Sequence, residues 1–192
     1  MPRISVIGCS GSGKTTFARS IESAAGCARL ELDALYHQPD WTPLDTRLFR
    51  ERVVHFMDLN DDWVIDGNYS AVSHLVLERV TMVVWLDVSL LRATFQLGCR
   101  TLRRVFTRTE LWNGNREGIG NLCSLNPDKS VLAWMFKTHR SFPARYEDLK
   151  AESGLKAVVF HRIRTGAQAK ALLSSIRRTA GLRDVDGIDT TV

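Results

Sequence analysis

The chain has 192 residues, a formal net charge of +5 and an isoelectric point near 9.3, and its 44% hydrophobic and 24% charged residues are ordinary for a soluble globular protein. No apolar run approaches the length of a membrane span, and a glycine-rich motif begins at Gly8, too early to leave room for a signal peptide. We therefore expect no membrane partner, and we predict one cytoplasmic domain over residues 1–180 with a disordered tail over residues 181–192.

The charge and the cysteine content narrow the class of ligand. Arginine outnumbers lysine by 20 to 6, and planar guanidinium groups suit phosphate better than ammonium groups do. The four cysteines have neither C-x-x-C spacing nor paired histidines, so we expect no zinc site and no disulfide framework. No helix-turn-helix, RNA-recognition or zinc-finger pattern occurs, which makes a nucleic acid only a minor alternative partner.

The first predicted elements are an apolar strand over Ile4–Ile7 and a helix over Phe17–Ala25, separated by a glycine-rich loop. The loop has the G-x-x-x-x-G-K-[ST] spacing of a phosphate-binding P-loop. Its glycines let a ligand approach the backbone, and the N–H groups of the helix N-terminus favour phosphate. Lys14 adds a cation for the β- and γ-phosphates, and the Thr15 hydroxyl can ligate Mg²⁺. The residues predicted to bind nucleotide here are Gly8, Ser10, Gly11, Ser12, Gly13, Lys14, Thr15 and Thr16.

The alternative for this stretch is a glycine-rich turn with a solvated lysine. By composition alone, the full pattern would arise by chance in on the order of one chain in a hundred or fewer. Chance would also have to place the pattern between a strand and a helix. We therefore predict that the chain binds a nucleoside triphosphate.

Strands and helices alternate along the rest of the chain. Residues 34–43, after a second strand, carry two prolines with Tyr, His and Trp, which is typical of an ordered functional loop. The predicted strands are 28–32, 63–66, 81–87 and 157–160, and the predicted helices are 44–59, 70–79, 89–107, 127–151 and 167–178. This alternation predicts an α/β fold with a parallel sheet and a ligand at the carboxyl ends of the strands. Residues 33–60 and 108–126 interrupt it at that edge, so we predict a substrate-binding insertion and a lid there.

Three aspartates follow predicted strands, where phosphoryl transfer needs a carboxylate near Mg²⁺. Asp33, Asp66 and Asp87 are each also compatible with a helix N-cap or turn, and for Asp87 the two interpretations are even. Asp66 is better placed because Gly67 permits close approach of substrate, so Asp66 and Thr15 are the predicted metal ligands. Asp33 is predicted to accept a hydrogen bond from the acceptor hydroxyl or to hold Mg²⁺ through water.

Several arginines lie near the predicted lid. Arg100 and Arg104 share one helix face at its mouth, and Arg116 lies within it. Cations that arrive on closure stabilise a transferring γ-phosphoryl group, although a solvated basic face is the usual role of any single arginine. We expect Arg104 and Arg116 to act in catalysis with Lys14, and Arg100 to bind nucleotide. His37, in the aromatic loop, is expected to be structural.

Several segments resemble a known family. The chain resembles P-loop nucleotide kinases of the adenylate-kinase-like group, and more closely small bacterial proteins labelled adenylate kinase or DNA topology modulation protein. The segments that carry the resemblance are Gly8 to Thr15, Leu32 to Tyr36, Trp63 to Tyr69, Val84 to Asp87 and Glu110 to Glu117. Together they extend the resemblance from Arg3 to about Arg178.

The resemblance implies a three-layer P-loop NTPase fold, with a five-stranded parallel sheet, helices on both faces, a substrate-binding insertion and an arginine-bearing lid. It also implies ATP on Gly8 to Thr16, with Mg²⁺ at Thr15 and near Asp66. Adenylate kinases read D-G-F-P-R after the third strand, whereas this chain reads Asp66-Gly67-Asn68-Tyr69-Ser70. This difference, together with the aromatic loop, puts AMP in doubt as the acceptor.

The predicted function is that of an ATP- and Mg²⁺-dependent phosphotransferase acting on a small molecule or a nucleotide. The alternative is an ATP-binding regulatory protein with little turnover, acting on a protein or DNA partner. A third interpretation is an NTP hydrolase. Such an enzyme needs a side chain that positions a water molecule, and the sequence offers no residue for this role. The identity of the acceptor and the choice between monomer and homodimer stay open.

Overall fold

The computed structural model of the chain describes residues 2–116, 139–140, 143–144, 146–148, 150–151 and 158–181. Its centre is a five-stranded sheet in which all neighbouring strands run parallel, in the order β2-β3-β1-β4-β5. The strands are β1 (Arg3–Gly8), β2 (Ala28–Glu31), β3 (Trp63–Asp66), β4 (Met82–Leu86) and β5 (Val159–Ile163). Because β1 is the middle strand, the loop that follows it opens at the centre of the sheet's carboxyl edge.

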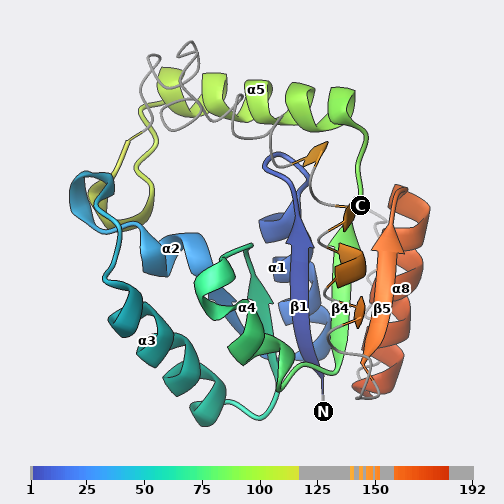
Figure 1. Cartoon of the computed structure of the whole chain (residues 1–192). Helices are drawn as coiled ribbons and strands as arrows, with labels where there is room; N and C mark the ends of the chain where they lie inside the picture. Colours follow the sequence, from blue (N-terminus) through green and yellow to red (C-terminus); the bar gives the residue numbers. More distant parts are fainter. Residues whose placement is uncertain are drawn as a thin grey trace, which may run out of the picture.

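Both faces of the sheet are apolar, and successive strand residues point to opposite faces. On β4, Val83 and Trp85 belong to one hydrophobic core, while Val84 and Leu86 belong to the other. Helices α3 (Thr46–Leu59) and α4 (Ser70–Leu77) contribute to the first core. Helices α1 (Lys14–Ala25) and α8 (Gly166–Thr179) contribute to the second. The result is the predicted three-layer α/β fold (Figure 1).

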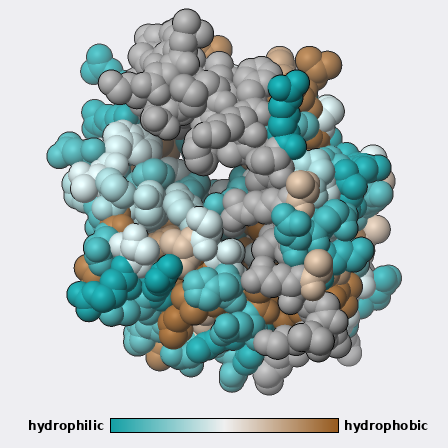
Figure 2. Space-filling model, in the orientation of Figure 1, coloured by the Kyte–Doolittle hydropathy of each residue, from teal (hydrophilic) through white to brown (hydrophobic). Residues whose placement is uncertain are grey.

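Helix α5 (Leu90–Phe106) crosses above the carboxyl ends of the strands (Figure 1). Two shorter segments lie at the same edge: α2 (Leu32–Tyr36) with η1 (Pro39–Trp41), and η2 (Trp112–Gly114). The space-filling view is hollowed near its centre, below α5 (Figure 2). Two insertions and one helix thus surround the place where the P-loop emerges.

Most predicted elements are present, with shifted ends. Asp33 does not end a strand, because β2 stops at Glu31 and Asp33 lies in the first turn of α2. The last strand runs to Ile163 rather than to Phe160, since its pairing with β4 extends as far as Leu86. The predicted lid is described only as far as Arg116, and most of the helix expected over residues 127–151, like nearly all of the tail, lies outside the described residues. No helix in the described part of the chain is long and apolar enough to cross a membrane.

Candidate functional site

The loop after β1 leads into a helix whose N-terminus is open. Gly13 is the N-cap of α1, and it provides no side-chain hydrogen bond to the first turn, which also contains no acid. By contrast, the side chains of Asp45, Ser89 and Thr165 cap α3, α5 and α8. An uncapped helix N-terminus presents N–H groups and a positive dipole end to an anion. The α1 N-terminus is therefore suited to hold phosphate.

The P-loop is packed against α5, and Gly11 makes that packing possible. Its φ angle is +80°, and a Cβ atom built on it would lie 2.4 Å from the carbonyl oxygen of Ala93. Cys9 is buried in a small cluster with Ala93 and Leu97 of the same helix. Burial raises the pKa of the Cys9 thiol, which disfavours the nucleophilic thiolate form.

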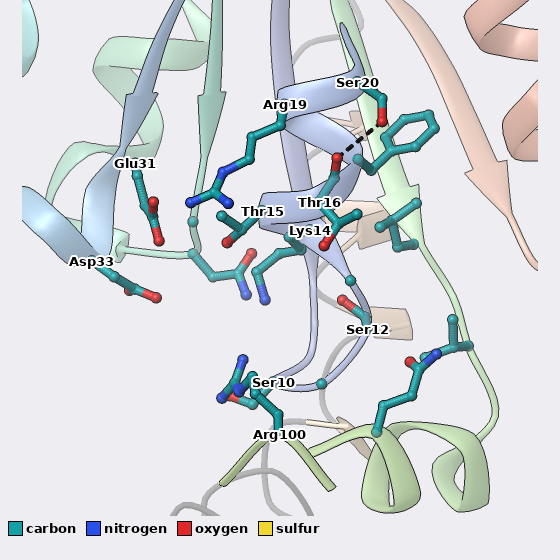
Figure 3. A pocket seen from close by; sticks show the side chains of 18 of the residues that line it. Ser10, Ser12, Lys14, Thr15, Thr16, Arg19, Ser20, Glu31, Asp33 and Arg100 are labelled. Atoms are coloured by element: carbon teal, nitrogen blue, oxygen red, sulfur yellow. Dashed lines mark hydrogen bonds between the residues drawn. The ribbon is translucent and has the colours of Figure 1, made fainter. Parts of the chain in front are cut away.

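Lys14 is held inside the cleft among charged neighbours. Its Nζ donates to the carbonyl oxygen of Cys9 at 2.9 Å. Burial lowers the pKa of Lys14; Asp33 and Asp66 oppose this effect, while Arg100 adds to it. Arg100 extends from α5 toward the P-loop (Figure 3). Two cations held near one another at a helix N-terminus form a site for a polyanion.

Thr15 and Asp66 meet at the start of α1. The Thr15 hydroxyl donates to Asp66 Oδ1 at 3.2 Å. Asp66 Oδ2 is buried and accepts no hydrogen bond from the described residues, although Arg29 lies 3.5 Å from it. Burial, with help from Glu31, raises the pKa of Asp66 to about 6. A buried carboxylate beside a hydroxyl, with one oxygen unsatisfied, fits the partial donor set that Mg²⁺ completes with phosphate oxygens and water. No group of three or more His, Cys, Asp or Glu side chains in the described part forms a closed metal site.

Asn68 and Tyr69 link the segment after β3 to the rest of the site, and the sequence analysis did not identify them. Asn68 Oδ1 accepts from the Gly8 N–H at 3.2 Å, and its Nδ2 donates to the Gly8 carbonyl oxygen. The Tyr69 hydroxyl donates to Asp33 Oδ1 at 2.7 Å. Burial and the Asp33 carboxylate raise the pKa of Tyr69, so the hydroxyl stays protonated. Two of the three residues that depart from the adenylate-kinase pattern, Asn68 and Tyr69, therefore position the P-loop and Asp33.

The predicted arginines divide into two groups. Arg100 and Arg104 line the cleft, as the spacing on α5 predicts. Arg116 is not among the described lining residues; its guanidinium pairs with Glu110 at 3.7 Å, and both side chains are largely exposed. The structure therefore places Arg100 and Arg104 in the cavity that the P-loop also lines, and Arg116 is not among the described residues that line it.

The structure gives contacts for two other residues. The cap of α5 is Ser89 and not Asp87, whose Oδ2 accepts from Nε of Arg162 at 2.8 Å and from Nε of Arg164 at 3.0 Å. Gly67 lines the cavity, and it also makes a close contact that the sequence analysis did not predict. Its φ angle is +137°, and a Cβ atom there would lie 2.8 Å from the Cβ of Leu32, so the α2 segment also approaches this glycine closely.

The two insertions touch one another through polar and aromatic contacts. The Trp41 N–H donates to Asn115 Oδ1 at 2.9 Å, and Asn115 Nδ2 donates to the Gln38 carbonyl oxygen at 2.9 Å. The rings of His37 and Trp112 stack with their centroids 5.9 Å apart. His37 thus has a place in the wall of the cleft, which its position in the aromatic loop indicated. The partners in the second insertion could not have been identified from sequence spacing, because they are more than 70 residues away.

One cavity of about 1970 Å³ joins these features. This volume exceeds the few hundred to about 1000 Å³ usual for one small ligand, so there is room for two. On the β4–β5 side the cavity is lined by Val88, Ile163 and the start of α8. On the β2–β3 side it is lined by Asp33, Tyr69 and the aromatic insertions. The P-loop lies between these two halves.

Solved structures with the same architecture were found by comparison. A gluconokinase from Sinorhizobium meliloti 1021 aligns with a TM-score of 0.51 and 17% identity, covering 94% of each chain. A shikimate kinase from Acinetobacter baumannii, in complex with shikimate, aligns with a TM-score of 0.53 and 16% identity over 93% of this chain and 92% of that chain. This chain has the P-loop kinase fold.

A second shikimate kinase, from Bacteroides thetaiotaomicron, shares the P-loop kinase fold with a TM-score of 0.51 and 12% identity, over 94% of this chain and 99% of that chain. No protein-family model and no curated protein matches this chain. At such low identity the likeness establishes the P-loop kinase fold alone. The chemistry of the site must be inferred from this chain's own residues.

Proposed function

We propose that the chain is an ATP- and Mg²⁺-dependent phosphotransferase that phosphorylates a small molecule. The observation that carries this proposal is that one cleft holds an open phosphate-binding helix N-terminus, with Lys14 in it, next to the Asp33 carboxylate. A kinase needs a phosphate site and a proton acceptor side by side in one cavity. The P-loop kinase fold of the solved small-molecule kinases supports the same conclusion.

Each residue then has a role in the transfer. Bound Mg²⁺ would neutralise charge on the β- and γ-phosphates, with the Thr15 hydroxyl and the Asp66 carboxylate as its protein ligands. Lys14 binds the β- and γ-phosphates, and Arg100 and Arg104 stabilise the charge on the transferring group. Asp33, oriented by Tyr69, accepts the proton of the acceptor hydroxyl as its oxygen bonds to the γ-phosphorus and the bond to ADP breaks.

The resemblance to adenylate kinases does not identify the phosphoryl acceptor in our proposal. Tyr69 and Ser70 stand where adenylate kinases have the proline and the arginine. Here Asn68 bonds to the P-loop and Tyr69 bonds to Asp33 instead. The phosphoryl acceptor that we propose is therefore a small-molecule alcohol and not AMP.

The test is ADP formation from ATP in the presence of Mg²⁺ and a panel of sugars, polyols, hydroxy acids, nucleosides and nucleoside monophosphates. At least one class should raise the rate well above the rate without acceptor. Lys14→Ala should abolish this transfer while leaving thermal unfolding unchanged. Lys170→Ala, at an exposed position of α8, is the matched control and should retain full activity.

Asp33→Asn separates the two halves of the site. It should reduce kcat by about a hundredfold or more, the usual contribution of a general base, while the Kd for ATP changes little. An equal loss of kcat and of affinity for ATP would place Asp33 in the nucleotide site. A flat response to the whole panel with tight ATP binding would refute the kinase and favour the ATP-binding regulatory protein.

A further inference from the structure

The half of the cleft on the β2–β3 side, where Asp33 would meet the acceptor, has an aromatic wall. Tyr36, His37, Trp41, Tyr69 and Trp112 all line the cavity. Their rings form a continuous set, with centroids 4.7 Å apart for Tyr36 and Tyr69, 5.3 Å for Tyr36 and His37, and 5.9 Å for His37 and Trp112. Trp41 stands edge-on to Trp112 at 6.4 Å. Rings that are half-buried and face a cavity offer flat apolar surface to a ligand.

This wall is held in place by the chain and does not need a ligand to form. Asn113 Nδ2 donates to the His37 carbonyl oxygen at 2.6 Å, and the buried Asn115 bonds to both Trp41 and Gln38. The two insertions are therefore tied together through the backbone next to the rings. A preformed wall binds a rigid ligand at a lower entropic cost than a wall that must assemble on binding.

The charges on this wall are negative. In the described segments 31–41, 67–70 and 109–112, the charged residues that line the cavity are Glu31, Asp33 and Glu110. His37 adds no positive charge near neutral pH, because burial lowers its pKa. Arg29 Nη1 lies 3.3 Å from Glu31 Oε2, and Arg116 Nη2 lies 3.7 Å from Glu110 Oε2, so both of these acids are paired. Arg19 of α1 also extends toward the side of Glu31 (Figure 3). Asp33 remains as the charge beside the rings.

The cations that line the cleft come from other elements. Lys14 and Arg19 belong to α1, and Arg164 precedes α8. Arg92, Arg100 and Arg104 belong to α5, and the proposed function assigns the last two to the phosphates. In the described segments of the wall, an acceptor with a carboxylate or phosphate of its own would meet Asp33 and the rings without a guanidinium partner. Like charges in such a site oppose binding.

The geometry points to an acceptor that is a ring-containing alcohol without an anionic group, uncharged or cationic, which lies against Trp112 and places a hydroxyl at Asp33. This inference rests on the proposed function and names its substrate class. It also separates this chain from the solved shikimate kinase, which holds a ring alcohol that carries a carboxylate. Sugar, cyclitol and nucleoside rings all present a face of this kind to a tryptophan.

The experiment compares pairs of compounds that differ only in an anionic group: methyl shikimate and shikimate, glucose and glucuronate, adenosine and AMP. Binding is measured by saturation-transfer NMR and by tryptophan fluorescence, with a non-hydrolysable ATP analogue and Mg²⁺ present, and ADP formation is measured with ATP. In any pair that binds, the member without the anion should bind roughly ten- to a hundredfold more tightly, as expected for one unpaired like charge near Asp33.

Four variants test the origin of the preference. Trp112→Ala should weaken binding of the uncharged member by about tenfold, the scale of one lost stacking contact, and Trp112→Phe should restore most of it. Phe106→Ala removes an aromatic ring that is 82% exposed on α5, outside the cleft, and should change nothing. Asp33→Asn should shrink the difference between the members of each pair, which a purely structural role of Asp33 would not do.

The outcomes separate the two proposals. Tighter binding of the anionic members, or no binding of any pair, overturns the substrate class. Binding of the uncharged members with no ADP formed leaves the substrate class standing as a ligand class and refutes the phosphotransferase. Selective binding together with ADP formation supports both.

Discussion

We expect the ionised carboxylate of Asp66 to lower the free energy of unfolding, because this side chain is buried. The pKa shift of the carboxyl gives the size of this loss. Burial raises the pKa of this carboxyl from 3.8 to about 6 in the folded protein. Between about pH 4 and pH 6 the folded protein holds a proton that the unfolded chain releases, so the free energy of unfolding falls as the pH rises through this window. At pH 7.5 the ionised carboxylate costs the protein about 3 kcal/mol relative to an unperturbed one.

Asp66→Asn removes this cost while keeping the size of the side chain. In the absence of nucleotide and Mg²⁺, we expect the variant to be more stable by up to about 3 kcal/mol at pH 7.5, which raises Tm by about 6 to 12 °C for a chain of this length. At pH 4.5 the gain should shrink to about 1 kcal/mol, because most folded molecules already carry the proton. Urea unfolding and calorimetry at the two pH values measure both numbers.

The control for this comparison is Asp61→Asn, because that side chain is 83% exposed and its contact with Arg3 is long. It should change the free energy of unfolding by less than about 0.5 kcal/mol at either pH. An Asp66→Asn variant that is equally stabilised at both pH values, or not stabilised at pH 7.5, contradicts the argument. The same variant should also lose Mg²⁺-dependent nucleotide binding, which the Asp61 control retains.

Two further predictions concern the P-loop. Asn68→Ala removes both side-chain hydrogen bonds to Gly8, so it should lower the free energy of unfolding by about 1–3 kcal/mol and weaken the binding of ATP. The control is Asn60→Ala, which loses one hydrogen bond at the end of α3 and should lower Tm without changing the Kd for ATP. Calorimetric titration with ATP distinguishes the two variants. Gly11→Ala places a methyl group against the Ala93 carbonyl and should abolish ATP binding, whereas Gly26→Ala meets no atom and costs only the roughly 1 kcal/mol of a left-handed residue. Unchanged ATP affinity in Gly11→Ala would show that the loop does not need its packing on α5.

The order of the elements and the P-loop could be predicted from the amino-acid sequence alone. The P-loop is a contiguous pattern whose parts act locally, and the alternating apolar strands specify a sheet that is buried on both faces, so Lys14, Thr15 and the core strands could be predicted. Asp66 could be predicted as well, because the end of β3 lies beside the P-loop in any sheet of this strand order.

Contacts between residues that are distant in the sequence could not be predicted and are seen only in the folded chain. Asp87 and Asp66 look alike in sequence, yet two arginines at the end of β5 donate hydrogen bonds to Asp87, whereas Asp66 accepts from Thr15 and lies 3.5 Å from Arg29. Asn68 and Trp112 carried no recognisable signal, because Asn68 acts on Gly8, 60 positions away, and Trp112 stacks on His37, 75 positions away. Contacts between segments this far apart are set by how the insertions pack above the sheet, and no local pattern in the chain records them.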